Sequence, residues 1–298
     1  MRGWHSKRMR FQSLPRLTAL LTLLTTAAPL VSAQALSAQA SSARQTGGPW
    51  TLVWSDEFSG RAGTQPSGKD WNYDIGNEDQ SGWGNHELEY YTRSPENVRL
   101  DGKGNLEIWA RKNRADLWCW NGDACPYTSA RLTTIGKVQF LYGKAEARLR
   151  VPPGQGYWPA FWALGNGRLA WPDNGELDIM EWLGRTPNTV YGTLHGPGYS
   201  GSTGLSAQAE LPQPASAGFH TYTLIKRRAE IIWLLDGKVY HRVTPSDIPA
   251  GAKWVFDQPF YLLLNLAVGG DWSGNVGAST VFPGAMRVDY VRVWKEGK

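Results

Sequence analysis

Apolar and polar residues alternate with a period of two along several segments of the chain, most clearly over residues 105–111, 143–151 and 286–294. Successive side chains of a β-strand point to opposite faces, so this alternation predicts antiparallel strands with one face buried and the other solvated. No window shows a convincing long amphipathic helix. The pattern therefore predicts an all-β protein.

Turn signals separate the predicted strands, at spacings typical of β-sandwiches. They are Asp101-Gly102, Asn121-Gly122, Asn174-Gly175 and Asp236-Gly237. We expect an antiparallel β-sandwich of the jelly-roll type, with one sheet face concave.

The two ends of the chain differ in composition. Five basic residues and no acidic one precede an apolar run over residues 17–31, a layout that predicts a secretory signal peptide over residues 1–33. The run is about 15 residues long, shorter than the roughly 20 of a membrane-spanning helix; an uncleaved N-terminal anchor is the alternative. Residues 34–48, rich in Ala, Ser, Gln and Gly, predict a flexible linker. We expect residues 49–298 to form one β-sandwich domain, and we expect secretion to the extracellular space or periplasm.

The charge of the chain depends on its first segment. The formal net charge of +5 falls to zero when the five basic residues of the predicted signal peptide are removed. The remainder shows no basic stripe of the kind that binds nucleic acid or an anionic membrane. We therefore expect a monomer with a neutral partner and, after signal cleavage, no membrane contact.

The chain contains two cysteines, Cys119 and Cys125, around a turn-like segment. In an exported protein such a pair predicts a local disulfide. A zinc site is not favoured, because zinc needs four ligands and no His or Cys pair with ligand spacing stands nearby.

Sixteen tryptophans are more than a core of this size needs. Several adjoin Gly, Pro or Asn, as Trp83, Trp158 and Trp272 do, which favours loops and rims, although any one of them could be an ordinary core residue. Indole faces stack on the C–H faces of sugar rings, so a groove lined with them would hold a neutral polysaccharide.

Three acids in the segment 171–182 are the candidate catalytic groups. Glu176 and Asp178 share a face of a regular strand, whereas Glu181, five residues from Glu176, would face the apolar side. A carboxylate buried there without a partner would be costly. A β-bulge near Ile179 and Met180 would return Glu181 to the face of the other two.

Three adjacent carboxylates cannot all ionise at their solution pKa values, so the row supplies several protonation states at one pH. A retaining glycosidase needs this, because it uses an ionised nucleophile and a protonated acid about 5 to 5.5 Å apart. A calcium site and solvated acids on an exposed strand are the alternatives.

The motif Glu-Leu-Asp-Ile-Met-Glu over residues 176–181 resembles that of the glycoside hydrolases of family 16, and its extra Met180 resembles the bulged form of the laminarinases. Lichenases carry the form without this residue. Further matching blocks follow in order along the domain. They cover residues 54–58, 82–92, 128–132, 142–148, 158–162, 192–201, 264–270 and 288–294.

The resemblance implies roles for individual residues. Glu176 would be the nucleophile, Glu181 the general acid and base, and Asp178 the residue that orients and tunes Glu176. The implied substrate-binding residues are Asn85 and Arg131 on the glycone side, Trp158 and Trp162 near the cleavage point, and His195 close to Glu181. Asn265 and Trp272 are left open as further candidates.

The resemblance also implies a structural calcium ion, with Glu57 and Asp289 as ligands together with the Gly102 carbonyl; carboxylates that merely cap strand ends are the alternative. No cofactor is expected for catalysis. The chain departs from the family at Leu224-Ile225-Lys226, where members often carry a tryptophan, which concerns local sheet packing.

The sequence thus predicts a secreted, retaining endo-β-1,3-glucanase acting on β-glucans such as laminarin. A mixed-linkage β-1,3-1,4-glucanase or another polysaccharide hydrolase of the family is the alternative enzyme. A non-catalytic glucan-binding protein is the alternative from another class, and the presence of all three acids argues against it.

Overall fold

A computed structural model describes residues 49–77, 79, 81–114 and 116–297 of the chain. The predicted signal peptide (1–33) and linker (34–48) lie outside these residues. Among the described residues, no helix combines the length and the apolar character that a membrane span requires.

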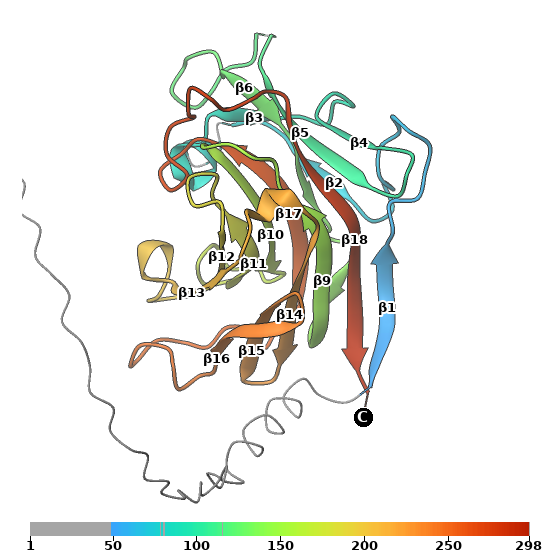
Figure 1. Ribbon diagram of the computed structural model, residues 1–298. Coiled ribbons are helices and arrows are strands. Elements are labelled where there is room, and N and C mark those ends of the chain that lie inside the picture. Colours follow the sequence, from blue (N-terminus) through green and yellow to red (C-terminus); the bar gives the residue numbers. More distant parts are fainter. Residues whose placement is uncertain (1–48, 78, 80, 115, 298) are drawn as a thin grey trace, which may run out of the picture. The chain divides into compact units, whose positions relative to one another are not determined.

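The described domain consists of two β-sheets with a few short helical turns, which confirms the predicted all-β sandwich (Figure 1). The ten-stranded sheet has the order β16 (Lys238–Val243), β15 (Glu230–Leu235), β14 (His220–Arg227), β9 (Gly143–Arg150), β18 (Gly284–Glu296), β5 (Leu106–Lys112), β6 (Tyr127–Ser129) and β3 (Glu89–Tyr91), with β1 (Trp50–Asp56) on β18 and β4 (Val98–Leu100) on β5.

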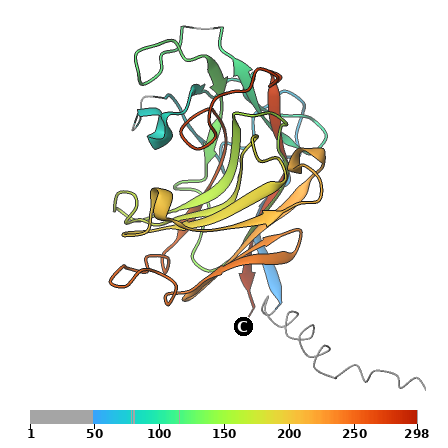
Figure 2. The same ribbon diagram turned by 60° about the vertical axis from the view of Figure 1, so that its left-hand side comes forward.

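The eight-stranded sheet has the order β13 (Leu205–Glu210), β12 (Thr189–His195), β11 (Glu176–Trp182), β10 (Tyr157–Gly165), β17 (Phe260–Val268), β7 (Arg131–Thr133) and β2 (Asn72–Asp74), with β8 (Gln139–Phe140) on β17. Figure 2 shows β11, β12 and β13 side by side in this sheet. The helical turns are η1 (Gly82–His86), η2 (Gly201–Thr203) and η3 (Ala215–Ala217).

The strands predicted from alternation are present as β5, β9 and β18. In β9 every second residue is buried, as expected for a strand with one face on the core. The predicted turn at Asp236-Gly237 joins β15 to β16; both residues have positive φ, at 49° and 76°, as a tight two-residue hairpin requires.

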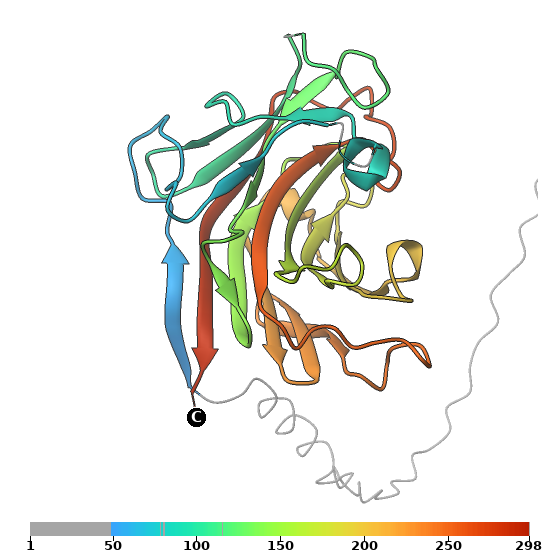
Figure 3. The same cartoon turned by 180° about the vertical axis from the view of Figure 1, so that it is seen from behind.

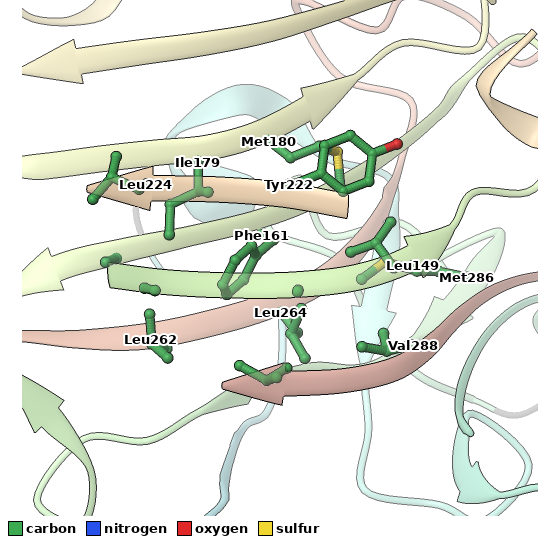
Figure 4. Close-up of a cluster of buried hydrophobic side chains, with 14 of the residues drawn as sticks. Leu149, Phe161, Ile179, Met180, Tyr222, Leu224, Leu262, Leu264, Met286 and Val288 are labelled. Carbon is green, nitrogen blue, oxygen red and sulfur yellow. The ribbon is translucent and has the colours of Figure 1, made fainter. Parts of the chain in front are cut away.

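The core lies between the two sheets and contains side chains from both (Figure 4). The ten-stranded sheet contributes Leu149, Tyr222, Leu224, Met286 and Val288, and the eight-stranded sheet contributes Phe161, Ile179, Met180, Leu262 and Leu264. Their removal from water is the main stabilising contribution, at about 25 cal/mol per Å² of apolar surface.

A second, smaller apolar cluster consists of Trp158, Leu183 and Ala267, with Tyr191 and Trp272 packed against it. It is separate from the core between the sheets. Figure 3 shows β17 bowed toward β9, so the concave side of this strand faces away from the ten-stranded sheet. The eight-stranded sheet therefore presents a curved outer face with aromatic residues on it.

The predicted disulfide between Cys119 and Cys125 is present, in the hairpin between β5 and β6. Within the segment Leu224-Ile225-Lys226, where the resemblance implies a tryptophan, Lys226 of β14 is fully buried. Its ammonium donates hydrogen bonds to the carbonyls of Leu141 and Gln258. Burial lowers the pKa of Lys226 to about 8. Here a buried cation takes part in the local packing of the sheet.

Candidate active site

Strand β11 carries the three acids, and it is irregular where the sequence predicts a bulge. On one side Phe161 of β10 pairs with Met180 and Trp162 with Asp178, so Ile179 has no partner of its own. On the other side, β12 pairs with β11 at Asp178 and again at Glu181, with a register shift between them. The extra residue is the predicted β-bulge.

The bulge separates the side chains of β11 into two groups. The apolar side chains of Leu177, Ile179, Met180 and Trp182 all pack in the core between the sheets. Ile179 and Met180 are adjacent in sequence, so both can face the core only because the strand is bulged. Glu181 is thereby turned away from the core and accepts a hydrogen bond from the Trp158 indole at 3.0 Å.

The bulge is supported from the opposite sheet. Trp233 of β15 donates its indole N–H to the carbonyl oxygen of Asp178 at 2.7 Å, within the core. Gly192 of β12 lies opposite the bulge, and a Cβ there would be 2.6 Å from Trp233 Cδ1 and 2.4 Å from Tyr240 Oη. Only glycine leaves room for this arrangement, because such approaches are shorter than van der Waals contact.

Each acid has a ring nitrogen as a neighbour. Trp171 donates to Glu176. His195 places its Nε2 3.1 Å from Asp178 Oδ2, within ion-pair range but without the alignment of a good hydrogen bond. His195, which the sequence placed near Glu181, pairs across the strands with Glu176. It lies close enough to lower the pKa of both glutamates.

Burial raises the pKa of all three carboxyls. It raises the pKa of Glu176 to about 8, and the neighbouring Asp178 carboxylate adds to the rise. Burial also raises the pKa of Asp178 to about 7, although the hydrogen bond from Glu176 lowers it in part. The pKa of Glu181 is raised well above its usual value by burial and then by Asp178. The row therefore holds fewer than three negative charges near neutral pH.

Aromatic and cationic groups flank the acids. Trp158 makes an edge contact with Trp272, with ring centroids 5.4 Å apart, and Trp272 makes another with Tyr191 at 5.0 Å. On the Trp162 side, the Arg131 guanidinium lies 4.8 Å from the centroid of Trp162 and 4.4 Å from that of Trp83. Indole faces and a guanidinium are groups that bind sugar rings and hydroxyls.

The structure brings most of the predicted site residues together. Trp158 contacts Glu181, Trp162 pairs with Asp178, and Arg131 stacks on Trp162. Asn85 lies on η1 and reaches this group indirectly, through the carboxylate of Glu87. Their roles in binding sugar stay predictions.

Sequence reasoning missed Trp171 and Trp233. Trp171 stands five residues before Glu176 in the same segment, residues 171–182, so its position was a usable signal. Trp233 is 55 residues from Asp178, and nothing in the pattern of β15 indicates which buried tryptophan reaches the bulge.

Glu57 and Asp289, the expected calcium ligands, each face an arginine. Both oxygens of Glu57 accept hydrogen bonds from Arg292 at 2.8 Å, and Asp289 accepts one from Arg148 at 2.5 Å. Arg292 also lowers the pKa of Glu57. Among the described residues, no three His, Cys, Asp or Glu side chains are grouped to hold a metal. In this arrangement each carboxylate is paired with an arginine, and calcium binding stays a prediction from the resemblance.

Comparison with known proteins gives consistent matches over most of the chain. Residues 85–292 match the family model described as glycosyl hydrolases family 16. The X-ray structure of the endo-β-1,3-glucanase from Pyrococcus furiosus is 45% identical, with a TM-score of 0.77 over 83% of this chain and 96% of its own. The laminarinase catalytic domain from Thermotoga maritima is 44% identical, with a TM-score of 0.78 over 84% of this chain and 99% of its own. A beta-glucanase from Rhodothermus marinus is 42% identical over 257 residues, which is 83% of this chain and 85% of the relative.

The raised pKa of Glu176 predicts how replacement by Gln changes stability with pH. Below its ordinary pKa of 4.5, the carboxyl is protonated in the folded and the unfolded chain alike. Between pH 4.5 and about 8, the unfolded carboxyl ionises while the folded one stays protonated, so the unaltered protein loses stability as the pH rises. The melting temperature of Glu176→Gln should rise relative to the unaltered protein across this window, by about 2–4 °C per kcal/mol.

The measurement is thermal unfolding from pH 4 to pH 8, by calorimetry or circular dichroism. Glu210→Gln, at an exposed position of β13 in the same sheet, is the matched control. The difference between its melting temperature and that of the unaltered protein should not grow with pH. A Glu176→Gln difference that stays constant over the range would contradict the prediction.

Proposed function

Because the chain belongs to the glycosyl hydrolases of family 16, we propose that it is a secreted endo-β-1,3-glucanase that cleaves its substrate with retention of anomeric configuration. The observation that carries the proposal is the bulge in β11, which puts Glu176, Asp178 and Glu181 on one face among indole rings. The names of the Pyrococcus and Thermotoga relatives support the β-1,3 linkage.

In the first step, the Glu176 carboxylate attacks the anomeric carbon while the Glu181 carboxyl protonates the glycosidic oxygen. The bond between the anomeric carbon and that oxygen breaks. Burial keeps Glu181 protonated before this step. In the second step, water attacks the glycosyl-enzyme ester, gives its proton to Glu181 and releases Glu176. Both acids return to their starting protonation states.

Glu176 must be ionised in order to attack, and Asp178 can accept its proton. The two carboxyls share a hydrogen bond, which raises the pKa of Glu176 and lowers that of Asp178. A shift of this proton to Asp178 leaves the charge on Glu176, which is partly exposed and accepts the Trp171 N–H. Asp178 therefore acts as the proton store beside the nucleophile.

Secretion rests on the segment that precedes the domain and on the disulfide. The predicted signal peptide over residues 1–33 supports export, and the pairing of Cys119 with Cys125 fits an oxidising compartment. N-terminal sequencing of protein recovered from outside the cytoplasm should find a start near Gln34.

A substrate panel tests the proposed activity. The protein is incubated with laminarin, mixed-linkage β-glucan, agarose and carboxymethyl-cellulose, and the products are resolved by size. Short oligosaccharides from laminarin, formed before any accumulation of glucose, are expected. Preferential cleavage of mixed-linkage glucan would favour the β-1,3-1,4 alternative, and binding of laminarin without cleavage would favour a glucan-binding protein.

Substitution of each glutamate separates their roles. Glu181→Gln should lower kcat on laminarin by about 10²–10⁴-fold, but should keep most of kcat/KM on an aryl β-laminaribioside, because a leaving group that needs no proton makes the first step independent of Glu181. Its kcat on that substrate should still fall, because the second step lacks its base. Glu176→Gln should lose both activities, because no carboxylate remains to form the ester. Glu210→Gln is the control and should match the unaltered protein. Full activity of Glu176→Gln would overturn the assignment.

The indole that supports the bulge should also matter for activity. Trp233→Phe removes the donor to Asp178 and should cost about 1–3 kcal/mol of stability and at least tenfold in kcat, because the freed carbonyl lets the bulge move. The control is Trp182→Phe, which removes a part-buried bond from an indole of the bulged strand to the Pro187 carbonyl, an acceptor outside the bulge. Equal loss of kcat in the two variants at equal stability would contradict a specific role for Trp233.

A further inference from the structure

A chain of hydrogen bonds begins at Trp162 and runs away from the acids. The Trp162 indole donates to Asn265 Oδ1 at 2.8 Å, and Asn265 Nδ2 donates to the Tyr91 hydroxyl at 3.1 Å. Tyr91 in turn donates to Glu87 Oε2 at 2.9 Å. The residues come from β10, β17, β3 and the segment after η1, so the chain joins four parts of the fold.

The same carboxylate also holds Asn85. Asn85 Nδ2 donates to Glu87 Oε1 at 3.2 Å, so both oxygens of Glu87 are occupied. Asn85 and Trp162 are two of the residues expected to contact the sugar on the glycone side and near the cleavage point. Glu87 thus connects two separate parts of the expected sugar-binding surface without belonging to it.

The direction of every bond in the chain is set by its ends. An indole can only donate, which fixes Asn265 with its oxygen toward Trp162 and its amide nitrogen toward Tyr91. The Tyr91 oxygen accepts that bond, so its single proton is free for Glu87. A carboxylate accepts from Tyr91 and Asn85 together, whereas a glutamine offers only one accepting oxygen at that end.

Burial makes these bonds hard to replace. Glu87, Tyr91 and Asn265 are 4%, 0% and 6% exposed, so water does not compete for the same groups. The neighbouring Glu89 is fully buried, and its carboxyl accepts the Val268 N–H. Burial and then the Glu87 carboxylate raise the pKa of Glu89, while the donors Tyr91 and Asn85 both bond to Glu87.

We propose that Glu87 is a positioning residue for the glycone side of the site, which fixes the Asn85 amide directly and the Trp162 indole through Tyr91 and Asn265. This inference rests on the proposed function. Trp162 pairs with Asp178 across β10 and β11, so a rotation of its indole changes the surface on which the sugar lies beside the nucleophile. Loss of these hydrogen bonds should therefore weaken binding of the transition state.

Tyr91→Phe tests the proposal with the removal of one oxygen atom. It disconnects Trp162 and Asn265 from Glu87 and leaves the bond from Asn85 in place. The matched control is Tyr222→Phe, because Tyr222 is also buried but its hydroxyl has no hydrogen-bond partner among the described residues. In assays well below the melting temperature, we expect kcat/KM on laminarin to fall about tenfold in Tyr91→Phe and to stay unchanged in Tyr222→Phe. Glu87→Gln should show a similar loss.

A double-mutant cycle distinguishes positioning from a general structural effect. Trp162→Phe keeps an aromatic face and removes the N–H that starts the chain. If the chain acts through this indole, Tyr91→Phe should change kcat/KM less than twofold in the Trp162→Phe background. Losses that multiply in the double variant, or a Tyr91→Phe protein as active as the unaltered one, would overturn the inference while the proposed function stands. Absence of laminarin cleavage by both the unaltered protein and Tyr222→Phe would overturn both.

Discussion

The hydrogen bond from Trp233 to the carbonyl of Asp178 joins the two sheets at the one position where β11 leaves regular geometry. A bulge takes backbone groups out of the ladder between strands, and a buried carbonyl without a partner is costly. The indole N–H supplies that partner from the opposite sheet, and Gly192 leaves space for the ring. With the bulge held in this way, Ile179 and Met180 both fill the core and Glu181 turns toward the other acids.

The same packing accounts for the electrostatics of the acids. The carboxyls of β11 lie on a sheet whose other face is the apolar core, and the rings of Trp158 and Trp171 donate to the two glutamates. Their raised pKa values follow mainly from this burial, with their mutual repulsion as a second cause. A neutral polymer is a suitable partner for such a surface, because its binding brings no further charge next to the partly protonated carboxyls.

Much of the fold and the centre of the site could be predicted from local pattern. Alternation gave β5, β9 and β18, and the odd spacing between Glu176 and Glu181 indicated a bulge that the pairing of β11 confirms. Contacts between distant segments could not be predicted in the same way. Tyr91 and Asn265 are 174 residues apart, and no periodicity shows that they share a hydrogen bond. The arginines opposite Glu57 and Asp289 are a further case, because motif matching identifies the carboxylates but not the partner that neutralises each one.

The central claim is that the acids of the bulged strand carry out a double displacement. Trapping of the covalent intermediate tests it most directly. The unaltered protein is incubated with a 2-deoxy-2-fluoro-β-laminaribioside that carries a good leaving group, then digested and examined by mass spectrometry. We expect one adduct, on the peptide that contains Glu176, and none in Glu176→Gln. An adduct on another residue, or turnover of the parent substrate to a product of inverted configuration without an adduct, would contradict the assignment.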